Sequence, residues 1–185
     1  MSYENAHKEP HFITAYEKHF QGLNPKRVLE IGVQGGGSLK IWAKMFPNAE
    51  IVGVDILEDC KKYESGNIKV FIGDQHDVKF LETLGEFDII IDDGGHTMTQ
   101  QHVSLKTLML QLSDTGIYVI EDLHTSYWEQ FQDIQHTTID EIKELVDDLH
   151  DYADQSVRCS NRKGIENKYK LSSITIYPGI VFLQR

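Results

Sequence analysis

A series of short apolar segments, each followed directly by a glycine or an acidic residue, constrains the fold of this chain more than any other feature. Five such segments cover residues 27–31, 50–54, 68–72, 87–91 and 117–120. Continuously apolar strands that alternate with helices are typical of a parallel sheet with both faces covered. Open sheets of this kind bind ligands at the carboxyl ends of their strands. We therefore predict a ligand site at that edge, lined by carboxylates.

The remaining segments complete a single α/β domain. Helices are predicted at residues 12–20, at 39–46 with Ser38 as its cap, at 98–112 and at 139–152. Thr138 and Glu141 have the spacing of a capping box. A turn is predicted at residues 113–116, and Pro178-Gly179 separates two apolar segments, 173–177 and 180–183, which predict a closing antiparallel hairpin. The fold class expected is a Rossmann-like, mostly parallel seven-stranded sheet over residues 1–185. Residues 1–24 would form an N-terminal helical extension outside the sheet.

Composition narrows the choice of partners. The chain has 185 residues and a formal net charge of −11, which fits one domain and argues against a nucleic-acid partner. No apolar stretch reaches the roughly 20 residues that a membrane span needs, and the polar first residues do not resemble a signal peptide. Cys60 and Cys159 stand apart without metal-ligand spacing, which favours a reducing cytoplasm. Residues 129–155 contain nine acidic residues and one basic residue, a pattern typical of a solvated helix face.

The turn after the first strand is rich in glycine and reads EIGVQGGGS over residues 30–38. Glycines let the backbone approach a ligand closely. The turn does not match the GxGxxG pattern that seats a pyrophosphate, because Gln34 occupies the second glycine position. Glu30 would repel a pyrophosphate and suits a cationic or amine-bearing ligand. The alternative is a strand–helix turn without a ligand.

Two further carboxylates favour a nucleoside-bearing ligand. Asp55 ends the second strand, where a carboxylate can accept two hydrogen bonds from a ribose diol. Asp74 follows the third strand and could reach an adenine amino group. With the turn, these residues indicate S-adenosylmethionine, and the arrangement resembles the class I S-adenosylmethionine-dependent methyltransferases over nearly the whole chain. The cofactor-binding residues expected are Glu30, Gly32, Gly35, Ser38, Asp55, Asp74, Gln75 and Asp92.

A cluster of carboxylates and histidine is predicted where the fourth and fifth strands end. The segments read IDDGGH at residues 91–96 and IEDLH at residues 120–124. Carboxylates gathered without a neighbouring base repel one another, so a cation between them is expected. Oxygen ligands suit Mg²⁺ or another hard divalent ion, and we assign Asp93, Glu121 and Asp122 as its ligands. The alternative is that these acids only cap the following helices.

His96 lies among these acids, and histidine can accept a proton near neutral pH. We therefore assign His96 as the catalytic base. His124 is a candidate for the substrate pocket. Tyr127 and Trp128 could form an aromatic wall for a substrate or only pack against the protein.

The same two segments resemble a narrower family. IDDGGH followed by YVIEDLHTSYW is similar to the metal-dependent natural-product and macrolide-sugar O-methyltransferases, whose pattern is DDGSH and then IED. The resemblance implies that Asp93, Glu121 and Asp122 bind the metal, that His96 is the general base, and that Glu30, Gly32, Asp55 and Asp74 contact the cofactor. Gly95 replaces the usual serine, and we expect this chain to lack the extra N-terminal domain that some relatives carry.

Three functions follow from these residues as hypotheses. The first is an Mg²⁺-assisted O-methyltransferase that acts on a hydroxyl of a small molecule, such as a sugar, a polyketide or a catechol. The second is a non-catalytic S-adenosylmethionine-binding protein or sensor. The carboxylates and His96 disfavour it, because a protein that only binds the cofactor needs neither a base nor a metal ion. The third, a nicotinamide oxidoreductase, is weakened by Gln34. Association into a homo-oligomer is left open by the sequence.

Overall fold

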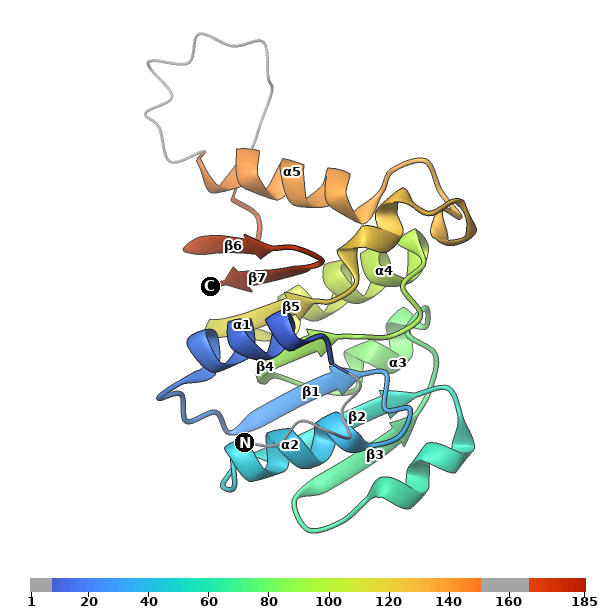
Figure 1. The fold of residues 1–185 in the computed structure, drawn as a ribbon, viewed down its shortest axis with the longest axis vertical. Helices are drawn as coiled ribbons and strands as arrows, with labels where there is room; N and C mark the ends of the chain where they lie inside the picture. Colours follow the sequence, from blue (N-terminus) through green and yellow to red (C-terminus); the bar gives the residue numbers. More distant parts are fainter. Residues whose placement is uncertain (1–7, 151–166) are drawn as a thin grey trace, which may run out of the picture.

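The protein is described here by a computed structural model that covers residues 8–150 and 167–185. Its centre is a seven-stranded sheet in the order β3-β2-β1-β4-β5-β7-β6 (Figure 1). The strands are β1 (Arg27–Ile31), β2 (Glu50–Asp55), β3 (Ile68–Ile72), β4 (Phe87–Asp92), β5 (Leu112–Ile120), β6 (Ser173–Tyr177) and β7 (Ile180–Gln184). The first five strands pair in parallel, and β7 pairs antiparallel with both β5 and β6. The predicted parallel sheet and closing hairpin are thus confirmed.

Helices cover both faces of the sheet. They are α1 (Pro10–Phe20), α2 (Gly37–Met45), α3 (Val78–Glu82), α4 (Met98–Leu108) and α5 (Thr138–Leu149). Short 3₁₀ turns lie at Glu58–Tyr63 (η1), Met109–Gln111 (η2), Leu123–Tyr127 (η3) and Glu129–Phe131 (η4). Buried residues of α1 and α2 pack on one face, and those of α3, α4 and α5 pack on the other. Figure 1 shows α1 and α2 in front of the sheet, with α3 and α4 behind it.

Alternation along the strands explains the two halves of the core. Ile89 and Ile91 of β4 pack on the α1 face, whereas Ile90 packs on the α4 face. Successive side chains of a strand point to opposite faces, so a strand buried on both sides is apolar throughout. The helix α1 supplies four buried residues, which makes it part of this core. No helix among the described residues is long and apolar enough to cross a membrane.

Several local predictions were wrong. The residues 113–116 do not form a separate turn, because β5 runs through them with a register shift opposite β4 between Phe87 and Ile89. The helix α4 ends at Leu108, and its last turn tightens into η2. The short helix α3 was not predicted from the sequence, and Asp77 caps it by accepting a hydrogen bond from the backbone N–H of Phe80.

Two predicted helix caps were also wrong. The capping box of α5 consists of Thr137 and Asp140, because it is the Thr137 hydroxyl that accepts the orphan N–H of Asp140. Gly36, with a φ of 66°, caps α2, so Ser38 lies inside the helix. The predicted end of α5 at residues 151–152 lies outside the described residues, as does Cys159.

Candidate active site

A cavity of about 520 Å³ opens at the carboxyl ends of the parallel strands, where the sequence places the ligand site. The predicted site residues that line it are Gly32, Gly35, Ser38, Asp55, Asp74, Gln75, Asp93, His96 and Asp122. The cavity lies between the turns that follow β1, β2 and β3 and those that follow β4 and β5. It therefore joins the glycine-rich turn to the carboxylate–histidine segment in one space.

Gly32 marks the point where the glycine-rich turn meets the turn after β4. Its φ is +93°, and a Cβ built there would lie 2.0 Å from the backbone oxygen of Asp93. A side chain is excluded both by this contact and by the positive φ. The backbone N–H of Asp93 also donates to the carbonyl of Ile31 at 3.0 Å. The two halves of the cavity are thus held together through their backbones.

Backbone strain concentrates around the cavity. Gln34, His96 and Asp122 are non-glycine residues with φ between 46° and 59°, and all three line it. Such conformations cost free energy and are commonly found at functional sites. Three of the four non-glycine residues with positive φ among the described residues thus line one cavity.

Asp55 fixes the glycine-rich turn. Its Oδ2 accepts hydrogen bonds from the backbone N–H groups of Val33 at 2.9 Å and Gln34 at 3.0 Å, and its Oδ1 accepts from Leu57 at 2.9 Å. Burial opposes the charge, but these donors lower the pKa of Asp55 below its ordinary value. Asp55 also lines the cavity, so its carboxylate both holds the turn and borders the ligand space.

Gln75 links the third strand end to the fourth. Its Oε1 accepts from the backbone N–H of Gly95 at 2.8 Å, and its Nε2 donates to Asp92 Oδ1 at 3.3 Å. Asp92 does not line the cavity, because its other oxygen accepts a hydrogen bond from Ser104 of α4 and it is fully buried. Burial raises the pKa of Asp92 to about 6. Asp74 lines the cavity, and its Oδ1 accepts the backbone N–H of His76 at 2.8 Å.

Asp93, His96 and Asp122 form a compact group at the other side of the cavity. His96 Nε2 lies 3.4 Å from Asp122 Oδ2 and 3.9 Å from Asp93 Oδ1. Each residue offers a ligand atom within 4.8 Å of the others, so the three could hold a metal ion. The Nδ1 atom of His96 is buried without a hydrogen-bond partner among the described residues.

Glu121 does not contact His96 as Asp122 does, but contacts Lys8 and Tyr16. Its Oε1 lies 2.5 Å from Lys8 Nζ and accepts a hydrogen bond from the Tyr16 hydroxyl at 2.5 Å. Lys8 Nζ also lies 2.7 Å from Asp93 Oδ2 and 3.2 Å from Glu30 Oε1. The ammonium of Lys8 thus sits between three carboxylates, and its side chain is only 2% exposed.

Lys8 carries its charge in this environment. Burial opposes the charge, but Glu121, Glu30 and Asp93 outweigh it and raise the pKa of Lys8 well above its ordinary value. The premise that no base lies near these acids was therefore wrong. Lys8 and Tyr16 were missed by the sequence analysis, because neither belongs to a motif and both lie more than 70 residues from Asp93. Repulsion among the carboxylates alone consequently does not demand a metal ion.

Ser38 completes this buried set from the side of α2. Its hydroxyl donates to Glu30 Oε2 at 2.6 Å, and Glu30 is fully buried. Burial raises the pKa of Glu30 although Lys8 opposes the shift. The predicted cofactor residue Glu30 therefore lies behind the cavity wall, and Ser38 stands between it and the cavity.

The predicted substrate residues lie outside the cavity lining. The side chain of Tyr127 is 70% exposed and that of Trp128 is 46% exposed. The His124 and Trp128 rings meet edge to face with centroids 4.7 Å apart, and Trp128 lies 6.0 Å from Phe131. Phe131 in turn lies 6.4 Å from the His96 ring. These aromatic side chains form a surface that leads from solvent to His96.

Comparison with known proteins shows relatives that methylate natural products. The chain is 33% identical over 191 residues to the 8-demethyl-8-alpha-L-rhamnosyl tetracenomycin-C 2'-O-methyltransferase of Streptomyces olivaceus, covering 94% of this chain and 50% of that protein. It is 37% identical over 155 residues to the mycinamicin VI 2''-O-methyltransferase of Micromonospora griseorubida, covering 74% of this chain and 39% of that protein. No family model matches the chain.

Among solved structures, the chain is similar to a methyltransferase of the same kind as these relatives. The MycE methyltransferase of the mycinamycin biosynthetic pathway, in complex with Mg and SAH, superposes with a TM-score of 0.82 at 30% identity. That alignment covers 94% of this chain and 49% of MycE. A second MycE structure, with Mg, SAH and mycinamycin VI, gives a TM-score of 0.80.

The seven-stranded sheet with its reversed β7, together with this structural match, defines a class I methyltransferase fold. Within that fold the chain is homologous to the O-methyltransferases of sugar-bearing natural products, and the resemblance seen in its motifs is confirmed. The chain spans about half the length of the curated relatives it matches, or less.

Proposed function

We propose that this chain is an S-adenosylmethionine-dependent, Mg²⁺-assisted O-methyltransferase for a hydroxyl of a sugar or another natural product. The observation that carries the proposal is the convergence of Asp93, His96 and Asp122 on the cavity that also contains the glycine-rich turn. The relatives' names and the Mg and SAH in the MycE structures support it. The proposal predicts one space in which methyl donor and acceptor meet.

The residues around the turn suit the methyl donor. Gly32 lets the backbone reach the ligand closely, and the carboxylate of Asp55, which lines the cavity, suits a ribose hydroxyl. Asp74 and Gln75 also line the cavity and are the residues we propose to contact the adenine. S-adenosylmethionine, when bound, supplies the methyl group as a sulfonium, whose positive charge is compatible with the surrounding carboxylates.

The oxygen ligands at the other end suit a hard divalent ion. Asp93 and Glu121 already hold a cation between them, the ammonium of Lys8, at 2.7 Å and 2.5 Å. With Asp122, they are the ligands we propose for Mg²⁺, which prefers oxygen to imidazole. The ion, when bound, supplies a Lewis acid that lowers the pKa of the acceptor hydroxyl. Lys8 would then have to withdraw from Asp93 and Glu121.

His96 is the residue we propose to take the proton. Its Nε2 faces both Asp93 and Asp122, whereas Nδ1 is covered by protein. Nε2 is therefore the ring nitrogen that we propose to accept the proton. The adjacent aromatic surface of His124, Trp128 and Phe131 would orient the acceptor toward this nitrogen.

A metal titration with two variants separates the proposed roles. Chelator-treated protein is mixed with S-adenosylmethionine and a panel of rhamnosyl and macrolide acceptors, and methylated products are measured by mass spectrometry as Mg²⁺ is added. Wild type should depend on Mg²⁺. His96→Asn should keep Mg²⁺ binding but lose transfer by about 10²–10⁴-fold, as expected for loss of a general base. Asp122→Asn should weaken Mg²⁺ binding.

Other outcomes would contradict parts of the proposal. Transfer that is indifferent to chelator would remove Mg²⁺ from the reaction. Loss of Mg²⁺ binding in His96→Asn would make His96 a ligand and not the base. Calorimetric binding of S-adenosylmethionine with no turnover on any acceptor would favour the second hypothesis, a non-catalytic binding protein or sensor.

A further inference from the structure

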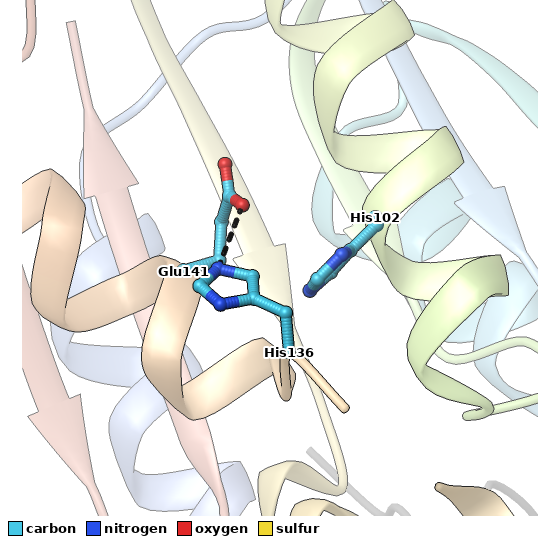
Figure 2. Close-up of side chains that lie close together, drawn as sticks. All are labelled: His102, His136 and Glu141. Atoms are coloured by element: carbon cyan, nitrogen blue, oxygen red, sulfur yellow. Dashed lines mark ion pairs between the residues drawn. The ribbon is translucent and has the colours of Figure 1, made fainter. Parts of the chain in front are cut away.

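A second group of metal-binding side chains lies outside the cavity, between α4 and α5 (Figure 2). His102 belongs to α4, His136 precedes the cap of α5, and Glu141 lies in the first turn of α5. Each offers a ligand atom within 4.8 Å of the other two. His102 lies more than 30 positions before the other two residues, so the packing of the two helices brings it to them.

One atom of this group is buried and lacks a partner. The Nε2 atom of His102 has no hydrogen-bond partner among the described residues, although His102 is only 6% exposed. A buried polar atom without a partner costs free energy, and such atoms call for an explanation such as a bound ion. Figure 2 shows the His102 ring directed from α4 toward His136.

The other two ligands already lie close to each other. His136 Nε2 is 3.5 Å from Glu141 Oε2, and the His102 and His136 ring centroids are 5.4 Å apart. Glu141 is only 8% exposed. Lys106 Nζ lies 3.3 Å from Glu141 Oε2, but the Lys106 side chain is half exposed and can turn into solvent. The carboxylate is therefore available to a stronger cation.

We propose that His102, His136 and Glu141 form a second metal site, selective for Zn²⁺ or a similar divalent transition ion, that ties α5 to α4. Two imidazoles and one carboxylate are a ligand set typical of zinc, whereas Mg²⁺ favours oxygen alone. Glu144 lies one turn further along α5, with its Oε1 3.7 Å from His136 Nε2, and its side chain is largely exposed. The site thus differs in metal preference from the carboxylates of the cavity.

The position of this site suggests what it does. The segment between β5 and α5 carries the aromatic surface of His124, Trp128 and Phe131, and His136 lies at its end. An ion that joins His136 to His102 would fix that end of the segment to α4. The site is therefore structural, and it does not depend on the function proposed for the cavity.

Zinc binding in the presence of excess Mg²⁺ tests the proposal. Metal-free protein of residues 1–185 is dialysed against Zn²⁺ with Mg²⁺ at millimolar concentration, and bound Zn²⁺ is measured by atomic absorption. The variants are His136→Asn, whose side chain is 40% exposed and so tolerates replacement, and His150→Asn as a matched control at the exposed end of α5. Hydrogen exchange of α5 is followed in parallel.

We expect wild type and His150→Asn to bind one more Zn²⁺ per chain than His136→Asn does. Addition of Zn²⁺ should slow exchange in residues 138–149 at least tenfold in the first two proteins and leave it unchanged in the third. Equal Zn²⁺ stoichiometry in all three proteins would overturn the proposal. It would also be overturned if all Zn²⁺ binding disappeared in Asp122→Asn, because the ion would then bind in the cavity.

Discussion

Replacement of Lys8 by methionine removes the charge that holds together two buried carboxylates, Glu30 and Glu121, and the partly exposed Asp93. Lys8 Nζ lies 2.5 Å from Glu121, 2.7 Å from Asp93 and 3.2 Å from Glu30, and the side chain is 2% exposed. Removing one partner of a buried ion pair typically costs about 3–5 kcal/mol, because the remaining charge is left uncompensated. Methionine preserves most of the side-chain volume, so the loss would be electrostatic. We expect Lys8→Met to lower the free energy of unfolding by about that amount without metal.

The assay is urea unfolding of wild type and variant, once in EDTA and once in millimolar Mg²⁺. If Mg²⁺ binds Asp93 and Glu121, it can replace the missing ammonium and restore most of the lost stability. Lys44→Met is the matched control, because Lys44 is exposed on α2 and should change stability by less than about 0.5 kcal/mol.

Two results would refute this reasoning. If Lys8→Met matched wild type in EDTA within about 0.5 kcal/mol, the ammonium would not be compensating buried charge. If the variant were destabilised but Mg²⁺ restored nothing, the same carboxylates would not bind the ion, and the ligand set proposed for Mg²⁺ would fail. If the ligand set is right, the Lys8→Met variant should bind Mg²⁺ more tightly than wild type does, since Lys8 competes for the same carboxylate oxygens.

Three further measurements address the framework of the site. Gly32→Ala should unfold at markedly lower urea concentration than Gly35→Ala, because a Cβ at Gly32 meets a backbone oxygen at 2.0 Å whereas Gly35 has open space. Burial and the nearby carboxylates raise the pKa of Cys60 to about 11, so its alkylation at pH 8, followed by peptide mass spectrometry, should be on the order of 100-fold slower than in urea-unfolded protein. The bonds from Lys143 and the helix cap lower the pKa of Asp140, so its contribution to stability is complete above about pH 4 and is lost on acidification. Asp140→Asn should therefore lose less stability than wild type between pH 4 and pH 2 in thermal unfolding.

The apolar segments were enough to predict the sheet, because strands buried on both faces leave a continuous signal. The prediction failed at residues 113–116, where polar residues and Gly116 are typical of a turn but belong to β5. The irregularity is a register shift opposite β4, and the Ser113 hydroxyl donates to Asp88 Oδ1 at 3.2 Å there. A pairing irregularity of this kind depends on the neighbouring strand and cannot be read from one segment.

Helix caps depend on which of several candidate side chains wins the local hydrogen bonds. Thr137 and Thr138 are both possible caps for α5, and the sequence does not decide between them. Thr138 is buried and its backbone N–H lies 3.2 Å from the sulfur of Met98, so the packing of α5 on α4 leaves Thr137 as the cap. The same packing brings His102 to His136, which explains why no sequence spacing indicated that group.

Strand alternation decides which predicted carboxylates reach the same cation. Val28 of β1 and Val119 of β5 belong to the half of the core on the α1 face. Side chains two positions further along a strand point to the same face, which places Glu30 and Glu121 there beside Tyr16 and Lys8. Asp92 follows Ile90 by two positions and points to the α4 face, where Ser104 donates to it.

Asp92 therefore cannot share an ion with Glu121, although both were predicted at the same edge of the sheet. The residues that follow them, Asp93 and Asp122, lie just beyond the strands and line the cavity. In each of the pairs Asp92-Asp93 and Glu121-Asp122, the first side chain is buried and the second lines the cavity. In both pairs the second carboxylate faces the ligand space beside His96. In the second pair the first carboxylate, Glu121, also contacts a cation, the ammonium of Lys8 on its face of the sheet.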